Sequence, residues 1–380
     1  MRRIYLDNAA TTAIDQRVID AMVEVMSNTS GNPSSIHNEG RKAKTLVENA
    51  RKSIANLLSV SPGEILFTSG GTEADNMAIR CAIDDYSVKH LITSPIEHHA
   101  VLHTAHLCQK QGINVHLVNI TKQGHVDMEH LKELFALTRG EKTLVSLMHA
   151  NNEIGNLLDI EAVGNICKEY KALFHCDMVQ TVGHLPINLK QCGVHFTAAS
   201  AHKFNGPKGV GFIYISDEVK ITPMIFGGAQ ERNMRGGTEN IYGIVGLAKA
   251  LEIAYDEMEE QSTRILDLKN YMIDRLNAEI PNVSYNGDHI GESLYTVLNV
   301  SFPPNDVAEM MLFYLDIEGI AASGGSACTS GSDLGSHVLA ELPVKEGHSA
   351  VRFSFGKYNT AEDVDLAVFK IKEILKLIPA

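Results

Sequence analysis

The feature of this sequence that most constrains its fold is a series of seven short apolar runs that alternate with helical patterns. The runs cover residues 64–68, 90–94, 114–118, 143–148, 173–176, 196–200 and 211–215. Amphipathic stretches with helical spacing accompany them, for example at 36–58 and 160–170. This alternation predicts an α/β fold, in which a mainly parallel, seven-stranded sheet lies between helices.

The sequence changes character after residue 240. A long helical pattern covers about residues 241–280, with apolar residues three and four positions apart, and leads out of the sheet region. After Pro281, a strand at 295–301, a helix at 306–318 and a strand at 350–355 predict a smaller α+β domain. Because 380 residues exceed one ordinary core, we expect two domains. The large one covers 15–255, and the small one combines 1–14 with 256–380.

Composition and charge argue against several classes of protein. A formal net charge of −13 disfavours direct binding of nucleic acid, which usually needs a basic face. No apolar stretch approaches the roughly 20 residues that span a bilayer, and polar residues follow Arg2 and Arg3 where a signal peptide would have an apolar core. The six cysteines form no CxxC pair, which argues against disulfides and a zinc ribbon and is typical of a reducing compartment. We therefore expect a cytoplasmic protein without a membrane segment.

Seventeen histidines raise the question of a metal site. His99 and His103 are four residues apart and could share a helix face, with His106 nearby. No cysteine or further carboxylate at ligand spacing completes this set. We therefore interpret these histidines as part of an ordinary helical surface and expect no bound metal.

Residues 65–76, with the sequence ILFTSGGTEADN, predict a strand, a glycine turn and the start of a helix. The free N–H groups and the helix dipole at such a turn bind phosphate, and the Thr72 hydroxyl beside Gly71 adds a donor. A plain strand–helix turn gives the same pattern, so the motif alone leaves both interpretations open. A nucleotide P-loop is disfavoured because the turn has no Walker lysine.

Two of the predicted strands end in residues that suit a pyridine-ring cofactor. Asp177 ends one run, at the edge of a parallel sheet where ligands bind; a carboxylate there keeps a pyridine nitrogen protonated, although it could also cap the next helix. Lys203 follows another run, where burial lowers the pKa of an amine and favours Schiff-base chemistry. Lys208 is less suited, because its Gly-Pro-Lys-Gly turn exposes it to solvent. The order of phosphate turn, Asp177, Lys203 and a carboxylate-binding Arg352 favours pyridoxal phosphate.

Cys328 lies in a segment of very small residues, SGGSACTSG at 323–331. These neighbours have almost no side chain to pack around a core thiol, and glycine gives the backbone wide freedom. The segment therefore predicts a flexible loop that presents the thiol. A free cysteine is more often inert than catalytic, but the upstream cofactor residues favour a functional role here.

Motifs in a consistent order give a resemblance that covers nearly the whole chain. They lie at residues 5–12, 31–37, 67–76, 97–101, 150–155, 200–209, 227–232, 235–240 and 326–330. In these motifs the sequence resembles cysteine desulfurases of the NifS/IscS type, within the class V aminotransferase superfamily of pyridoxal phosphate enzymes (fold type I). It departs from that pattern at Met178, Gly335 and Phe355, which are apolar or loop changes that remove no chemistry.

The resemblance implies a role for each matching residue around the cofactor. Lys203 should bind pyridoxal phosphate covalently, Asp177 should pair with the ring nitrogen, and Gln180 should bond the phenolic oxygen. His98 should lie against the ring face. The residues implied to hold the phosphate are Gly71, Thr72, Ser200 and His202. Thr238 should reach the phosphate of the neighbouring subunit, which implies a homodimer with shared active sites.

For the substrate, the resemblance implies that Arg352 and Asn152 bind the carboxylate of L-cysteine, through a two-point geometry that lysine lacks. Cys328 should take the sulfur as a persulfide, with Lys203 and His98 as acid–base residues and L-alanine as product. The sulfur would pass to an acceptor protein, for iron–sulfur clusters or for thio-modified cofactors or tRNA. Relatives that dock an iron–sulfur scaffold often carry a longer C-terminal segment, so the end at Ala380 argues against that docking mode.

Three alternatives stand beside this interpretation. The first two are other class V enzymes, a transaminase and a selenocysteine lyase; a transaminase has no use for a thiol on a loop, whereas acceptance of selenocysteine stays open. The third is a non-catalytic interaction protein that has kept the fold. Such a protein would be expected to lose Lys203, Asp177 or Arg352, and all three are present.

Overall fold

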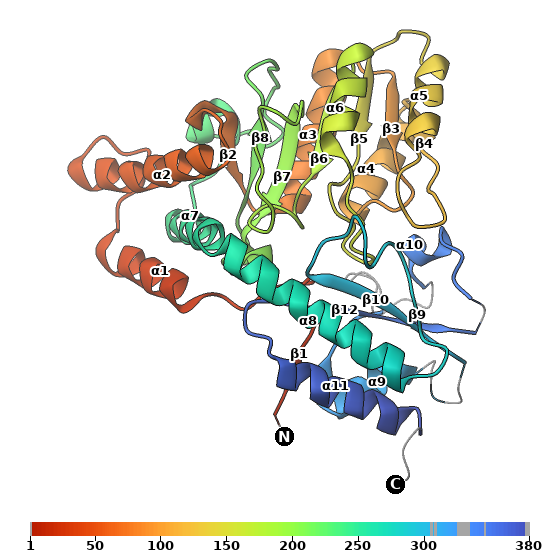
Figure 1. The fold of residues 1–380 in the computed structure, drawn as a ribbon. Coiled ribbons are helices and arrows are strands. Elements are labelled where there is room, and N and C mark those ends of the chain that lie inside the picture. The colour runs from red at the N-terminus through yellow and green to blue at the C-terminus, as the bar shows by residue number, and fades with distance from the viewer. Residues whose placement is uncertain (1, 305–306, 308–309, 325–334, 346, 377–380) are drawn as a thin grey trace.

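The computed structural model describes residues 2–304, 307, 310–324, 335–345 and 347–376, and a seven-stranded sheet is at its centre (Figure 1). In spatial order its strands are β2 (Ile65–Thr68), β8 (Gly211–Ile215), β7 (Phe196–Ser200), β6 (Leu173–Asp177), β5 (Thr143–Ser146), β3 (His90–Thr93) and β4 (Asn114–Leu117). β8 runs antiparallel to β2 and β7, and the other neighbours are parallel. The predicted sheet of seven mainly parallel strands is confirmed.

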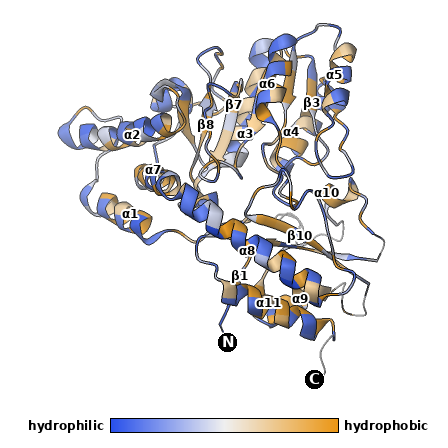
Figure 2. Ribbon diagram, viewed as in Figure 1, coloured by the Kyte–Doolittle hydropathy of each residue, from blue (hydrophilic) through white to orange (hydrophobic). Residues whose placement is uncertain are grey.

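Helices cover both faces of this sheet, so adjacent strand residues, which point to opposite faces, pack into different cores. Phe67 packs in one cluster with Val47 and Leu247, whereas its neighbour Leu66 packs in another with Met77. The helices of this part are α1 (Gln16–Asn28), α2 (Asn38–Leu57), α3 (Gly71–Tyr86), α4 (His99–Lys110), α5 (Met128–Leu137), α6 (Ile160–Glu169) and α7 (Ile241–Asp256), with 3₁₀ turns η1 (Pro62–Glu64), η2 (Ala201–Lys203) and η3 (Gln230–Asn233). Burial on both faces explains why the strands are continuous apolar runs, and Figure 2 shows β3 and β7 mostly in hydrophobic colours.

A second, smaller core is formed by the two ends of the chain. Its elements are β1 (Ile4–Tyr5), α8 (Met258–Glu279), β9 (Ser284–Tyr285), β10 (Val297–Phe302), α9 (Met311–Ile317), β11 (Ile320–Ala321), β12 (Ser349–Ser354) and α11 (Ala361–Ile374). The short helix α10 (His337–Ala340) packs separately, with Val338 against Ile96 and Ile154. β10 lies between β9 and β12 and is antiparallel to both, while β1 pairs with β11. Ile4 and Leu6 share a buried cluster with Val368. The division into domains at residues 15 and 255 stays a prediction.

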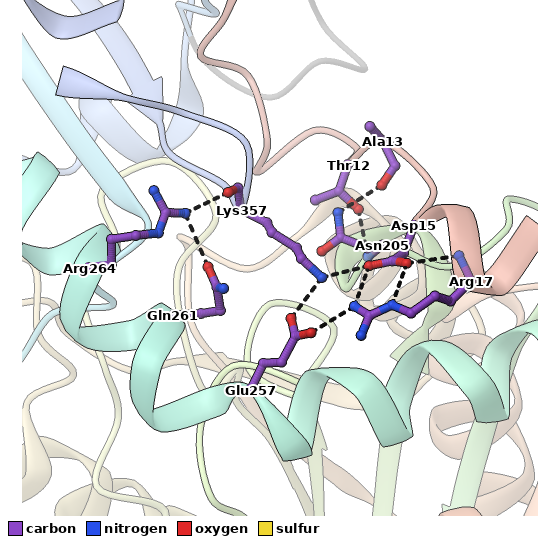
Figure 3. Close-up of polar contacts among 9 residues, drawn as sticks. All are labelled: Thr12, Ala13, Asp15, Arg17, Asn205, Glu257, Gln261, Arg264 and Lys357. Carbon is purple, nitrogen blue, oxygen red and sulfur yellow. Dashed lines mark hydrogen bonds and ion pairs between the residues drawn. The ribbon is translucent and has the colours of Figure 1, made fainter. Parts of the chain in front are cut away.

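The helical pattern at 241–280 forms two helices, α7 and α8, separated by Glu257 with φ −101° and ψ 2°. The Glu257 carboxylate lies 2.7 Å from Arg17 Nη2 and 2.7 Å from Lys357 Nζ. Asp15 binds the same two cations, at 2.8 and 2.6 Å, so four charges join the start of α1, the α7–α8 junction and the segment after β12 (Figure 3). Among the described residues, no helix has both the length and the apolar character needed to cross a membrane.

Candidate active site

A cavity of about 200 Å³ lies at the carboxyl ends of the central strands, next to β12. Its lining residues are Ala9, Ala10, Gly71, Thr72, Asp75, His98, Met148, Asn152, Asp177, Val179, Gln180, Ser200, His202, Lys203 and Arg352. Ten predicted site residues are thus brought together from segments far apart in the sequence. Two others are not among them: Thr238 is exposed outside this cavity, and Cys328 lies outside the described residues.

One wall of the cavity is the N-terminus of α3, which carries the predicted phosphate turn. Gly70 has φ +153°, and no side chain of the described residues caps this end of the helix. A Cβ atom on Gly71 would come within 2.5 Å of Val179 Cγ2, so the glycine allows the backbone to approach the opposite wall. Ser200 and His202 line the same space. Burial lowers the pKa of His202 to about 4, so its ring is neutral at pH 7.

Asp177 ends β6 as predicted, and its carboxylate points into the cavity rather than only capping the chain that follows. Oδ1 accepts a hydrogen bond of 2.8 Å from Val179 N–H. Burial raises the pKa of Asp177, and that N–H group and the charge of Lys203 oppose the rise. Nearby, Gln180 donates from Nε2 to the Ala9 carbonyl at 3.0 Å.

Lys203 ends the 3₁₀ turn η2 after β7. Its Nζ donates to the carbonyl oxygens of Ala9 at 2.6 Å and Ala10 at 3.0 Å. The Lys203 carbonyl lies 3.0 Å from His184 Nε2, which holds the backbone of the turn from behind. Lys208, in contrast, is exposed as the sequence predicted.

His98 is the N-cap of α4, where its Nδ1 accepts a hydrogen bond of 3.1 Å from Ala100 N–H. Burial, followed by the charge of Lys203, lowers the pKa of His98 to about 4. The ring is therefore neutral, with Nδ1 as acceptor and Nε2 as the protonated nitrogen. The adjacent His99 stacks on His103 at 5.0 Å between ring centroids.

Arg352, on β12, is 1% exposed and closes the cavity on the side of the smaller core. It donates to the Asn152 carbonyl at 2.8 Å and to Asp7 Oδ1 at 2.6 Å. Its Nε is buried and has no hydrogen-bond partner among the described residues. A buried guanidinium with an unused donor suits an anionic ligand. Asp7 was missed by the sequence argument, because nothing in its local pattern marks it.

The segment that carries Thr238 is tied to the phosphate turn through a charge pair. Arg235 Nε lies 2.9 Å from an oxygen of Glu73, which directly follows Thr72. A second pair anchors the same segment to α2, where Arg51 binds Glu231 with two hydrogen bonds of 2.8 Å. Thr238 itself is exposed to solvent in the single chain.

The donor set fits pyridoxal phosphate. A helix N-terminus without a side-chain cap and two hydroxyl groups suit the phosphate, and a buried carboxylate suits the pyridine nitrogen. The Lys203 amine reaches the same cavity, and the unused Arg352 Nε suits the carboxylate of an amino acid. Within the described residues, the group that could hold a metal ion is Asp75, His98 and Asp177, which also belongs to this cavity.

Fold and site together define an enzyme of the class V aminotransferases: the model of the family Aminotransferase class-V matches residues 4–367, and the chain belongs to this family. Enzymes of this family depend on pyridoxal phosphate.

Curated relatives give a more specific similarity. The chain is 43% identical to "Cysteine desulfurase IscS" of Dictyoglomus turgidum, over 99% of this chain and 95% of the relative. It is 44% identical to "Putative cysteine desulfurase IscS 1" of Bacillus subtilis, over 99% of each. A solved structure named "NIFS-LIKE PROTEIN" matches with a TM-score of 0.91 and 38% identity, over 99% of this chain and all of that chain. Another, "SspA in complex with cysteine", matches with a TM-score of 0.81 and 31% identity, over 94% of this chain and all of that one.

Proposed function

We propose that this protein is a pyridoxal phosphate-dependent cysteine desulfurase, which converts L-cysteine to L-alanine and transfers the sulfur to Cys328. The observation that carries this proposal is the convergence of Lys203, Asp177 and Arg352 on one cavity. The similarity to relatives named cysteine desulfurase supports the substrate and the reaction.

The residues of the cavity divide between cofactor and substrate. Gly71, Thr72, Ser200 and His202 would hold the phosphate, and Lys203 would attach the cofactor. Asp177 and Gln180 would bind the two polar positions of the ring, with His98 against its face. When bound, pyridoxal phosphate supplies an electron sink for the carbanion at the substrate Cα.

Arg352 and Asn152 would hold the substrate carboxylate, since Arg352 retains a free Nε donor among its described contacts. The Lys203 amine removes the Cα proton, and the neutral His98 ring exchanges a proton with the substrate thiol. The Cys328 thiolate forms a bond to the substrate sulfur as the Cβ–S bond breaks. The electron pair of that bond stays with Cβ, which takes a proton, and Lys203 returns a proton to Cα to give alanine, while Cys328 keeps the sulfur as a persulfide.

The test is to measure sulfide and alanine from L-cysteine with a thiol reductant, for the wild type and for Cys328→Ser. We expect equal amounts of both products from the wild type and loss of both in the variant, whose cofactor absorbance stays. Cys108→Ser, a change at a buried thiol of α4, is the matched control and should keep the activity. Alanine without dependence on Cys328 would indicate a lyase, and a keto acid in place of alanine would indicate a transaminase.

We further propose a homodimer in which Thr238 reaches the active site of the other subunit. The exposure of Thr238 and the anchoring of its segment at the phosphate turn, by the Arg235–Glu73 pair, support this arrangement. Light scattering would give the mass in solution. Mixing and refolding inactive Lys203→Ala and Thr238→Ala proteins should restore activity, because one site of the mixed dimer would carry both defects and the other none. Thr238→Ala with full activity would refute this role.

Persulfide sulfur from Cys328 would go to an acceptor protein of iron–sulfur cluster, thio-cofactor or tRNA synthesis. The five cysteines among the described residues are all free, which supports a reducing, cytoplasmic setting. A shift assay with labelled sulfur on a candidate acceptor would identify the route. We also propose the domain division 15–255 against 1–14 with 256–380, which limited proteolysis would test.

A further inference from the structure

A second acidic side chain, Asp75, lies in the cavity beside Asp177. It comes from the first turns of α3, is 1% exposed, and was not among the residues that the sequence marked. One ligand atom each of Asp75, His98 and Asp177 lie within 4.8 Å of one another. Two carboxyl groups therefore lie close together in the cavity proposed to hold the cofactor.

Asp75 is supported from behind by two residues of the sheet. Nε2 of His175 lies 3.3 Å from Asp75 Oδ1, and both atoms are buried without a hydrogen-bond partner among the described residues. On the other side of the ring, Nδ1 lies 2.8 Å from Ser146 Oγ. The register of the sheet brings the Ser146 and His175 side chains together, because Ser146 of β5 pairs with His175 of β6. His175 and Asp177, two residues apart on β6, point to the same face of the sheet.

The carboxyl groups of Asp75 and Asp177 cannot both be negatively charged at the same time. Close carboxylates in a buried site share protons, because two adjacent negative charges without solvent are costly. Burial raises the pKa of Asp75 strongly, and the charge of Asp177 raises it further. For Asp177, Lys203 opposes the rise. The proton of the pair therefore belongs on Asp75, and the negative charge on Asp177.

His175 stays neutral in this environment, because complete burial lowers its pKa to about 3. A neutral ring has one donor and one acceptor nitrogen, so it can bond both Ser146 and Asp75. It thereby fixes the orientation of the Asp75 carboxyl without adding a charge.

We propose that Asp75 is a positioning residue for Asp177: buried against the neutral His175 ring, it keeps a proton, so that Asp177 alone carries the negative charge that meets the pyridine nitrogen of the cofactor. This inference rests on the proposed cofactor site. Substitution can tell a protonated Asp75 from a negatively charged one, because an amide can replace a protonated carboxyl group but cannot replace a carboxylate.

The experiment compares Asp75→Asn, which keeps a neutral hydrogen-bonding group of the same shape, with Asp75→Ala, which removes it. The cofactor-free proteins are titrated with pyridoxal phosphate, and the dissociation constant is read from absorbance. We expect Asp75→Asn to bind within about threefold of the wild type and Asp75→Ala to bind about tenfold or more weakly. Asp84→Asn, an exposed change on the same helix, is the matched control.

A second readout does not depend on the cofactor. In the infrared spectrum of the cofactor-free protein at pH 7, the protonated carboxyl absorption should decrease in Asp75→Asn and stay unchanged in Asp84→Asn, while the contribution of the protonated Glu97 remains in both. A spectrum of Asp75→Asn without that loss would overturn the proposal. So would an Asp75→Asn protein as weak in binding as Asp75→Ala, since that result requires a negative charge at Asp75.

Loss of the proposed function and loss of the proposed role of Asp75 give different results. If the wild type does not bind pyridoxal phosphate, the proposed function fails. If the wild type binds and Asp75→Ala binds equally well, the cofactor site stands and the role of Asp75 alone is refuted. Circular dichroism melting shows that each variant is folded before its affinity is compared.

Discussion

Glu97 offers a direct test of the electrostatics in this structure, because its carboxyl group is buried without a cation. It precedes His98 and is 1% exposed. Oε1 accepts hydrogen bonds from Ser94 Oγ at 2.8 Å and Met148 N–H at 3.0 Å, while Oε2 has no partner among the described residues. Burial raises the pKa of Glu97 to about 8, against these two hydrogen bonds. We predict that Glu97 is protonated in the folded protein at neutral pH.

The consequence for stability follows from proton linkage. In the unfolded chain Glu97 ionises near its ordinary pKa of about 4.3, so the folded state binds one more proton than the unfolded state between that pH and about 8. The free energy of unfolding then falls by about 1.4 kcal/mol for each pH unit of rise. Between pH 5.5 and 7.0 this group alone should remove about 2 kcal/mol. The stability that the protonated form provides is complete at acid pH and is lost as the pH rises.

Glu97→Gln removes this dependence, because a neutral amide can keep both hydrogen bonds at its oxygen. We expect urea denaturation at pH 5.5 and 7.0, in one cofactor state, to show the variant losing about 2 kcal/mol less than the wild type over that interval. Glu133→Gln makes the same chemical change on the exposed side of α5 and should leave the wild-type slope unchanged. Equal slopes for the wild type and Glu97→Gln would show that Glu97 is ionised in the fold and would refute the reasoning.

Three further changes test other parts of the molecule. Arg352→Lys should raise KM for L-cysteine by about 10- to 100-fold in steady-state assays, since an ammonium cannot reproduce the two-point contact; an unchanged KM would remove Arg352 from the substrate site. Glu231→Ala should lower the free energy of unfolding by about 3–5 kcal/mol in urea titrations, because it removes the buried partner of Arg51, 2% exposed, and leaves only the ion pair with Glu48 at 3.2 Å among the described residues. Asp15→Asn should lower the melting temperature at pH 7 through its contact with Lys357. Hydrogen bonds from Arg17, then from Lys357, depress the pKa of Asp15, so the difference from wild type should vanish as pH falls well below the ordinary value of about 3.9.

Six strands of the central sheet could be predicted from the sequence because each is buried on both faces, whereas β4 at the sheet edge is partly exposed. Such a strand needs no alternation, so its apolar run coincides with its length. The predicted start of the first strand differs from the observed start of β2, because a polar side chain accepts a hydrogen bond from the backbone there. Glu64 was expected to begin a strand, but its carboxylate accepts a hydrogen bond of 2.8 Å from Ser61 N–H and ends a 3₁₀ turn instead.

The break between α7 and α8 could not be predicted, because the apolar spacing continues across it. The break depends on Glu257, which binds Arg17 and Lys357 (Figure 3). These partners are 240 and 100 residues away in the sequence, so no local pattern contains them. Asp75 could not be predicted for the same reason. Its neighbours in the sequence are those of an ordinary helix residue, and it lines the cavity only because α3 packs on the sheet.

The N-terminal segment shows how the two halves of the site depend on each other. Carbonyl oxygens of Ala9 and Ala10 accept hydrogen bonds from the Lys203 amine. Two residues earlier, Asp7 binds Arg352 at 2.6 Å. Four consecutive residues therefore hold both the lysine of the cofactor side and the arginine of the substrate side. An amine bonded to a further carbon has fewer hydrogens to donate, so attachment of a cofactor to Lys203 must change the hydrogen bonds of this segment. Because the Asp7 side chain of the same segment holds Arg352, the proposed cofactor attachment at Lys203 and the proposed substrate binding at Arg352 would be coupled through residues 7–10.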